Sequence, residues 1–394
     1  MKLILKILLL MTVVGLFTRC EKYTTVKIID ENFLEALIEQ GVDTDGDGTI
    51  SFQEAEDVKE LNIYYSDIFD LTGIESFVNL ETLRCGDNEF TSLDLSKNIA
   101  LRYLDIEHNK VSSLDISHNI NLTTLVTMYN PLGTLDISKN TSLLHLNCEA
   151  NQLRSLDVSK NLLLQELECV ANGLTNLDVS KNIALTKLRC WINQIESLDV
   201  SNNPLLTLLN CGNNKLTTLD LSGNTNLTGL YCDYNELTTL NVSGCTVLTD
   251  LHCAYNQLTV LDVSNKTSLE SLNCEENQIA SLDLSKSTSL EQLTCGNNQL
   301  SILDVTGNSA LGLLECSDNQ LTSLNTSNNP ELWMLYCGNN QISTLDISNN
   351  RKIYQLALNG MPSLTRVCVW VMPFPVEAYT AGSPNVYFTT DCSK

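Results

Sequence analysis

One fixed period runs through this 394-residue chain, and it is the feature that most constrains how the chain can fold. The interval from Cys148 to Cys169 recurs, singly or in whole multiples, among the cysteines Cys85, Cys148, Cys169, Cys190, Cys211, Cys232, Cys253, Cys274, Cys295, Cys316 and Cys337. A period of this size indicates one short structural unit that is copied many times and stacked on its neighbours. The sequence therefore predicts an elongated stack with a long exposed surface, and it disfavours a globule with a deep pocket.

Each unit begins with the pattern Leu-x-x-Leu-x-Cys-x-x-Asn-x-Leu, as in the copy that starts at Leu143. Leu146 and Cys148 alternate with polar neighbours, which is typical of a half-buried strand, and stacked copies would form a parallel sheet with rungs ~4.8 Å apart. The asparagine recurs in thirteen rungs, from Asn88 to Asn340, and these rungs would span roughly 60 Å. Because an amide is both a donor and an acceptor, this column is expected to satisfy backbone groups where the chain turns.

The second half of each unit reads Leu-Asp-Val-Ser-x-Asn and carries its own asparagine column, from Asn98 to Asn350. Cys245, Lys266 and Ser287 interrupt that column. There is no long helical pattern in this half, so we expect short extended or turn-like segments on the outer face.

These in-register copies resemble the leucine-rich repeat family over residues 58–361. The resemblance implies a mainly β fold, a curved solenoid with a parallel sheet. One repeat cannot bury its apolar face alone, so the stack needs a cap at each end. We expect a small helical N-terminal cap at residues 20–57 and, where the period fails among several prolines, an irregular C-terminal cap at residues 362–394.

Residues 43–54 match the EF-hand calcium loop, including the glycine at its sixth position, Gly48. The oxygen ligands that this resemblance implies are, in order, Asp43, Asp45, Asp47, Thr49, Ser51 and Glu54. Apolar helical stripes flank the loop, and its place just before the first repeat resembles the cap of internalin-like repeat proteins. We therefore expect one structural Ca²⁺ ion.

Residues 1–19 have the pattern of an export signal, with Lys2 and Lys6 before an apolar run that is too short to span a bilayer. The run ends at Cys20, which resembles the lipid-modified cysteine of bacterial lipoproteins, although Arg19 departs from the small residue expected there. We expect a lipid anchor on a bacterial outer membrane or cell surface, with plain secretion as the alternative.

The remaining cysteines serve different purposes. Neighbours in the core column would have Cβ atoms near the rung spacing, which exceeds the ~3.8 Å typical of a disulfide. They are therefore expected to be buried thiols that act as small apolar side chains. Cys368 and Cys392 flank the non-repetitive tail, and we predict a disulfide between them.

The net charge of −24 and the pI near 4.4 disfavour nucleic acid as a partner, because phosphate binding needs a basic surface. Membrane association is expected only through the lipid anchor. Much of the acidity comes from an outward aspartate column on the second half-unit, which we interpret as a solvated face that keeps the molecule soluble, with loose binding of cations as the alternative. We expect the chain to be a monomer.

Aromatic residues make up only 6% of the chain, yet several of them fall at positions next to the core cysteines that should point outward. The candidate binding residues are Tyr129, Trp191, Tyr231, Tyr234, His252, Tyr255, Trp333 and Tyr336. Tyrosine and tryptophan are common anchors of protein interfaces, and they also stack on sugars. Acidic neighbours favour a partner with basic or mixed charge. The alternative interpretation is that these aromatics merely fill variable positions.

No catalytic motif is present, and the four histidines share no constellation, so we do not expect an enzyme. The favoured function is a cell-envelope-anchored scaffold or adhesin that binds a protein. A glycan-binding surface protein is the second hypothesis, and a passive spacer without a ligand is the third.

Overall fold

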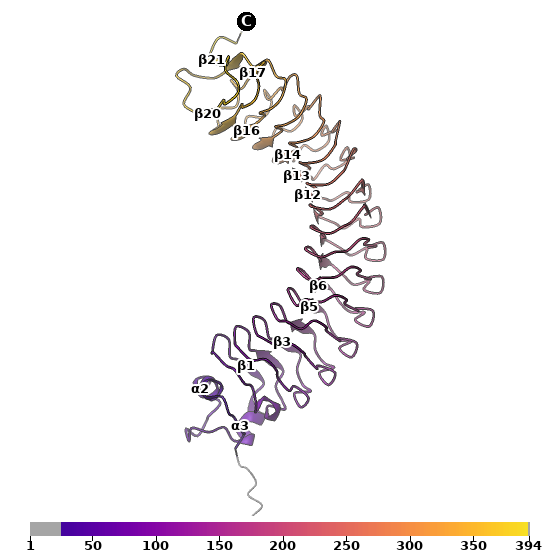
Figure 1. The fold of residues 1–394 in the computed structure, drawn as a ribbon, viewed down its shortest axis with the longest axis vertical. Coiled ribbons are helices and arrows are strands. Elements are labelled where there is room, and N and C mark those ends of the chain that lie inside the picture. The colour runs from indigo at the N-terminus through magenta and orange to yellow at the C-terminus, as the bar shows by residue number, and fades with distance from the viewer. Residues whose placement is uncertain (1–24, 393–394) are drawn as a thin grey trace, which may run out of the picture.

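The computed structural model describes residues 25–392 and shows a curved solenoid with its long parallel sheet along the inner edge of the arc (Figure 1). The export signal and Cys20 lie outside the described residues. Within residues 25–392, no helix is long and apolar enough to cross a membrane. The long parallel sheet and the curved, repetitive shape confirm the predicted leucine-rich repeat solenoid.

The elements are short and follow one another in a regular order. The helices are α2 (Glu31–Glu39), α3 (Phe52–Asp57) and the 3-10 turn η1 (Ile74–Ser76). The long sheet contains β1 (Glu60–Asn62), β2 (Thr82–Arg84), β3 (Tyr103–Asp105), β4 (Thr124–Val126), β5 (His145–Asn147), β6 (Glu166–Glu168), β7 (Lys187–Arg189), β8 (Leu208–Asn210), β10 (Gly229–Tyr231), β12 (Asp250–His252), β13 (Ser271–Asn273), β14 (Gln292–Thr294), β15 (Leu313–Glu315), β16 (Met334–Tyr336), β18 (Gln355–Ala357) and β20 (Ala378–Tyr379). Two small sheets on the outer side pair β9 (Thr218–Asp220) with β11 (Thr239–Asn241), and β17 (Thr344–Asp346) with β19 (Arg366–Cys368) and β21 (Tyr387–Thr389).

Every pair of neighbours in the long sheet is parallel and in register, so equivalent residues of successive repeats lie side by side. For example, Leu230 in β10 pairs with Leu209 in β8 and with Leu251 in β12, and all three are completely buried. The cysteines that follow these strands are free and buried, as predicted. Burial raises the pKa of Cys148 to about 12, because a thiolate is poorly solvated in an apolar core.

The asparagine column beside the long sheet satisfies the backbone at each turn, as the sequence predicted. The Nδ2 group of Asn214 donates to the carbonyl oxygens of Cys190, Cys211 and Gly212 at 3.0–3.1 Å. Its Oδ1 atom accepts from the backbone N–H of Ile195 at 3.0 Å, so the side chain connects two successive rungs. Groups that would otherwise be buried without partners are thus paired.

The second asparagine column also donates from rung to rung on the outer side, but most of its Oδ1 atoms, such as that of Asn224, are buried without a hydrogen-bond partner in the part of the chain that the structure describes. Of the residues that interrupt this column, Cys245 and Lys266 still make the rung-to-rung bond, whereas the hydroxyl group of Ser287 has no partner among the described residues. Asn224 donates to the carbonyl oxygen of Val200, 24 residues earlier, at 3.1 Å. At the equivalent place the thiol of Cys245 lies 3.5 Å from the carbonyl oxygen of Leu221. The ammonium group of the buried Lys266 also donates to such a carbonyl, that of Val242, at 2.7 Å. Cysteine and lysine therefore replace the amide donor without breaking the stack.

The N-terminal segment caps the solenoid with α2 and α3. Phe33 and Leu37 of α2 are fully buried in the continuous core. Asp30 begins α2 and accepts the backbone N–H of Phe33 at 3.1 Å. Its second carboxylate oxygen accepts the N–H groups of Phe69 and Asp70, at 2.7 and 3.0 Å, so one side chain joins the cap helix to the first repeat.

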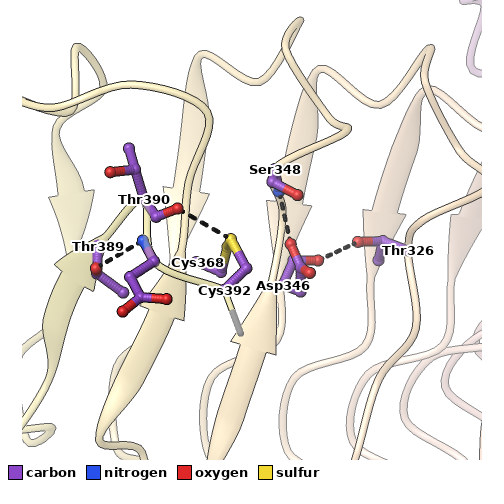
Figure 2. The surroundings of a disulfide bond; sticks show 8 residues. Thr326, Asp346, Ser348, Cys368, Thr389, Thr390 and Cys392 are labelled. Atoms are coloured by element: carbon purple, nitrogen blue, oxygen red, sulfur yellow. Dashed lines mark hydrogen bonds between the residues drawn. A yellow bond between two sulfur atoms is a disulfide. The ribbon is translucent and has the colours of Figure 1, made fainter. Parts of the chain in front are cut away.

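The C-terminal segment lacks the repeat pattern, yet its backbone still pairs with the preceding rungs. β20 extends the long sheet beside β18, and β21 adds to β19 on the outer side. With β1 at the other end, the sheet has 16 strands, against the thirteen rungs of the asparagine column. Figure 2 shows the disulfide that joins Cys368 at the end of β19 to Cys392, with the two Cα atoms 5.5 Å apart. This bond holds the tail against the last rungs.

Candidate partner-binding surface

The bend after each strand of the long sheet presents side chains to solvent. In thirteen rungs, the residue two positions after the core cysteine, or after the residue that replaces this cysteine, has a positive φ of 49–55°. Examples are Tyr234 at 55° and Tyr255 at 53°. This left-handed conformation is costly for residues other than glycine, so the surrounding turns must impose it. The two tyrosines remain 55% and 38% exposed. The repeat therefore builds a row of projecting side chains along one edge of the concave face.

The structure places the eight predicted binding residues in three separate groups. Five of them, Trp191, Tyr231, Tyr234, His252 and Tyr255, line one hollow of about 370 Å³. Tyr129 lies apart from them, stacked on His108 at 4.4 Å. Trp333 and Tyr336 belong to a third group near the C-terminal end.

The rings of the central hollow contact one another across neighbouring rungs. Tyr234 and Tyr255 stack with their centroids 4.3 Å apart and their planes only 7° from parallel. Tyr231 and His252 meet edge to face at 5.0 Å. The members of each pair are one full repeat apart in the sequence, so the repeat itself brings the rings together. Such pairs stabilise each other beyond simple burial and leave their outer faces available to a partner.

Carboxylates share the wall of this hollow with the rings. Asp233 accepts a hydrogen bond from the backbone N–H of Ala254 at 2.9 Å. Glu275 lies two rungs beyond Asp233 and also lines the hollow. Burial raises the pKa of both carboxyl groups, and the charge of Glu276 raises that of Glu275 further. Asn210, Asn213 and Asn273 complete the polar part of the wall.

The C-terminal group combines the predicted Trp333 and Tyr336 with two tyrosines that the sequence reasoning missed, Tyr354 and Tyr379. Trp333 stacks on Tyr354 at 5.5 Å, and the hydroxyl group of Tyr336 donates to Gln355 at 2.7 Å. A second hollow of about 620 Å³ is lined by Tyr336, Tyr354 and Tyr379 among others. Tyr354 follows Trp333 by one full repeat, so the period could have revealed it, whereas Tyr379 lies in the cap, where no period exists.

The calcium-loop residues lie in the N-terminal cap, away from this surface. Oxygen atoms of Asp43, Asp45 and Asp47 lie within 4.8 Å of one another. Glu54 is not one of this group of three. Its carboxylate accepts the N–H groups of Ser51 and Thr44, at 2.8 and 2.7 Å, and the hydroxyl group of Thr44 at 2.8 Å.

These hydrogen bonds, with that of the Ser51 backbone the strongest, lower the pKa of Glu54 to about 2. Glu54 also completes a capping box with Ser51 at the start of α3. A carboxylate oxygen has two lone pairs, and Oε1 of Glu54 accepts two of these hydrogen bonds while Oε2 accepts one, so a single lone pair, on Oε2, stays free. The donor set is thus an all-oxygen one, of the kind that Ca²⁺ prefers.

Comparison with known proteins places the chain in a family. No family model and no curated protein matches the sequence. Among solved structures, the functional domain of InlJ from Listeria monocytogenes, described as including a cysteine ladder, is 38% identical with a TM-score of 0.78. The match covers 84% of this chain and 74% of that one. The chain belongs to the internalin-type leucine-rich repeat proteins.

More distant structures share the fold of this internalin-type chain. A leucine-rich repeat protein from Leptospira interrogans is 24% identical, with a TM-score of 0.68 over 78% of this chain and 91% of that one. The internalin InlF from Listeria monocytogenes is 20% identical, with a TM-score of 0.57 over 93% and 96% of the two chains. Membership of the internalin type supports a general role as a protein-interaction scaffold.

Proposed function

We propose that this internalin-type chain is a cell-envelope-anchored scaffold or adhesin that binds a protein partner on its concave face. The observation that carries the proposal is the gathering of Trp191, Tyr231, Tyr234, His252 and Tyr255 into one hollow. Exposed aromatic anchors in a shallow depression are typical of the energetic centres of protein interfaces.

The test removes the stacked pair. Tyr234→Ala with Tyr255→Ala should weaken binding to target cells by about thirtyfold or more, since such anchors each contribute on the order of 2 kcal/mol. The thermal unfolding midpoint should change little, because both rings are on the surface. Tyr387→Ala is the control, as Tyr387 is an exposed tyrosine in β21, on the outer side of the solenoid. Equal binding by the double variant and the wild type would contradict the proposal.

A glycan ligand is the second candidate, and the amides of Asn210, Asn213 and Asn273 beside the rings favour it. Aromatic faces stack on sugars while amides bind hydroxyl groups. Treating the target cells with trypsin distinguishes the two ligands, because binding to a protein receptor is lost and binding to a polysaccharide persists.

We also propose that the loop from Asp43 to Glu54 binds one Ca²⁺ ion with a structural role. The convergence of three aspartate carboxylates and the hydrogen bonds that hold Glu54 against the loop support this proposal. A bound ion would connect α3 to the segment before it and stiffen the cap from which the first rung, β1, begins.

For localisation, we propose a lipid anchor at Cys20, on the pattern of the N-terminal segment that ends there. Cys20→Ser should move the protein from the detergent phase to the aqueous phase in a two-phase separation, because the acyl chains supply the membrane affinity. An aqueous wild-type protein would instead support plain secretion.

A further inference from the structure

We propose that the central hollow binds a lysine or arginine side chain projected by the protein partner. The inference rests on the proposed function and specifies the chemistry of the contact. It follows from three features of the concave face: uncompensated carboxylates, small residues between them, and tyrosine rings beside them.

The carboxylates of the concave face differ in whether a cation pairs with them. On β6 and β7, Glu166 pairs with Lys187 at 2.8 Å, and on the same rungs Glu168 pairs with Arg189 at 2.6 Å. Asp233, Glu275 and Glu315 take part in no ion pair among those found in residues 25–392, and neither do Glu107 and Glu149, which lie outside the hollow. The two carboxylates of the hollow, Asp233 and Glu275, therefore have no ion-pair partner of their own within this range.

The carboxylates of Asp233, Glu275 and Glu315 are also poorly solvated and close enough to interact. Burial is the main cause of the raised pKa of each, and repulsion adds to it, from Asp233 on Glu275 and from Glu275 on Glu315. The ring of His252 also lies in the hollow, edge to face with Tyr231. An incoming cation would relieve this repulsion, whereas a neutral sugar hydroxyl would not.

Small residues lie between the carboxylates along one column of the concave face. At the position after the core cysteine, the successive rungs read Gly212, Asp233, Ala254, Glu275 and Gly296. Carboxylates therefore alternate with residues that have little or no side chain. The carboxylate of Glu315 lies over Gly296: a Cβ added to this glycine would be 2.7 Å from a carboxylate oxygen of Glu315.

The rings supply the second half of the recognition. Trp191, Tyr231, Tyr234 and Tyr255 line the same hollow as Asp233 and Glu275. Aromatic faces attract ammonium and guanidinium groups, most strongly where water is partly excluded, and they pack against the aliphatic stem of lysine or arginine. A volume of about 370 Å³ can hold such a side chain.

The experiment measures binding of capped tetra-arginine, tetra-lysine and tetra-glutamine peptides to the purified full chain by calorimetry at physiological salt. The basic peptides should bind at least about tenfold more tightly than the neutral one. Asp233→Asn with Glu275→Gln should reduce that preference by about tenfold, and Glu275→Gln alone by about threefold. The single variant retains Asp233 and its hydrogen bond to Ala254, so it still tests the inference if the double variant misfolds.

The matched control changes the net charge equally on the opposite face. Asp136→Asn with Asp157→Asn should alter peptide binding by less than about twofold, because these exposed carboxylates lie outside the hollow. Equal losses in both double variants would show a general charge effect and overturn the inference. Equal binding of the basic and neutral peptides, or binding of a neutral chitooligosaccharide in place of the basic peptides, would overturn it as well.

Cell binding separates this inference from the proposed function. If the tyrosine double variant loses cell binding while Asp233→Asn with Glu275→Gln keeps it, the surface is correct and the cationic contact is wrong. If the tyrosine variant binds cells normally, the proposed function fails, and the peptide preference still decides whether the hollow accepts a cation.

Discussion

At the bend after each strand of the long sheet, the backbone conformation conflicts with many of the residues that occupy it. Asn213, Asn297 and Asn339 suit the left-handed region because a short amide side chain tolerates it. Ile192 has a φ of 54° at the same position, where a β-branched side chain is disfavoured. Strain at single residues is therefore tolerated because the neighbouring rungs impose the bend.

Ile192→Asn should stabilise the protein by about 1 kcal/mol, the cost of holding an unsuited residue in this region. The side chain is 38% exposed, so little apolar burial is lost, and Asn213 on the next rung shows that asparagine fits there. The thermal unfolding midpoint measures the change. Ile192→Val, which remains β-branched, is the control and should give no gain. An unchanged or lowered midpoint for Ile192→Asn would contradict this account.

At the scale of the elements, the two ends of the stack are closed by different means. The N-terminal cap buries Phe33 and Leu37 and is tied to the first repeat by Asp30. The C-terminal tail is joined to β19 by the disulfide between Cys368 and Cys392. Both devices hold a short element that could not bury its own apolar face.

Removing calcium should loosen the N-terminal cap. If the free ion is at 100 times its dissociation constant, binding stabilises the cap by about 2.7 kcal/mol. Amide hydrogen exchange in α2, α3 and β1 should therefore be faster with chelator than with millimolar calcium, while exchange in β12 should not change. Asp45→Asn with Asp47→Asn should abolish the difference. Identical amide exchange of the wild type with chelator and with calcium would contradict the calcium proposal.

At the scale of the whole molecule, the outward aspartate column also has a structural role. Each carboxylate accepts hydrogen bonds from the residue two positions later, such as the N–H of Ser180 for Asp178, and so closes a turn in every repeat. These bonds lower the pKa of Asp94, Asp115, Asp136, Asp157, Asp178, Asp199, Asp220, Asp262, Asp283 and Asp304. Asn241 and Asn325 form the same turn where aspartate is absent.

Stability should therefore fall as the pH drops below the ordinary aspartate pKa of 3.8. A carboxyl group whose pKa is lowered by folding stabilises the folded state above its unfolded pKa, and this contribution is lost on protonation. Relief of the overall negative charge acts in the opposite direction, but only down to the pI near 4.4. The denaturation midpoint from pH 5 to pH 2 measures the effect.

Asp136→Asn, Asp157→Asn and Asp178→Asn together should make the acid-induced fall shallower, since asparagine keeps the turn and does not titrate. An equal slope in the wild type and the triple variant would contradict a role for this column.

The spacing of Cys148, Asn151 and their copies was enough to predict the parallel sheet, the buried thiols and the asparagine ladder. The reason is physical: in a solenoid each rung contacts only its neighbours, so a column in the sequence becomes a column in space. The pairing of Tyr234 with Tyr255 follows from the same rule.

Only the tertiary structure showed the contacts that do not follow from the repeat columns of the sequence. Asp30 bonds to residues 39 and 40 positions later, and β20 pairs with β18 without any repeat pattern. It also showed that five aromatic residues share one hollow beside Asp233, while Tyr129 stands apart. These outcomes depend on side-chain orientation, burial and the available counter-charges, which the identity of residues in a column does not specify.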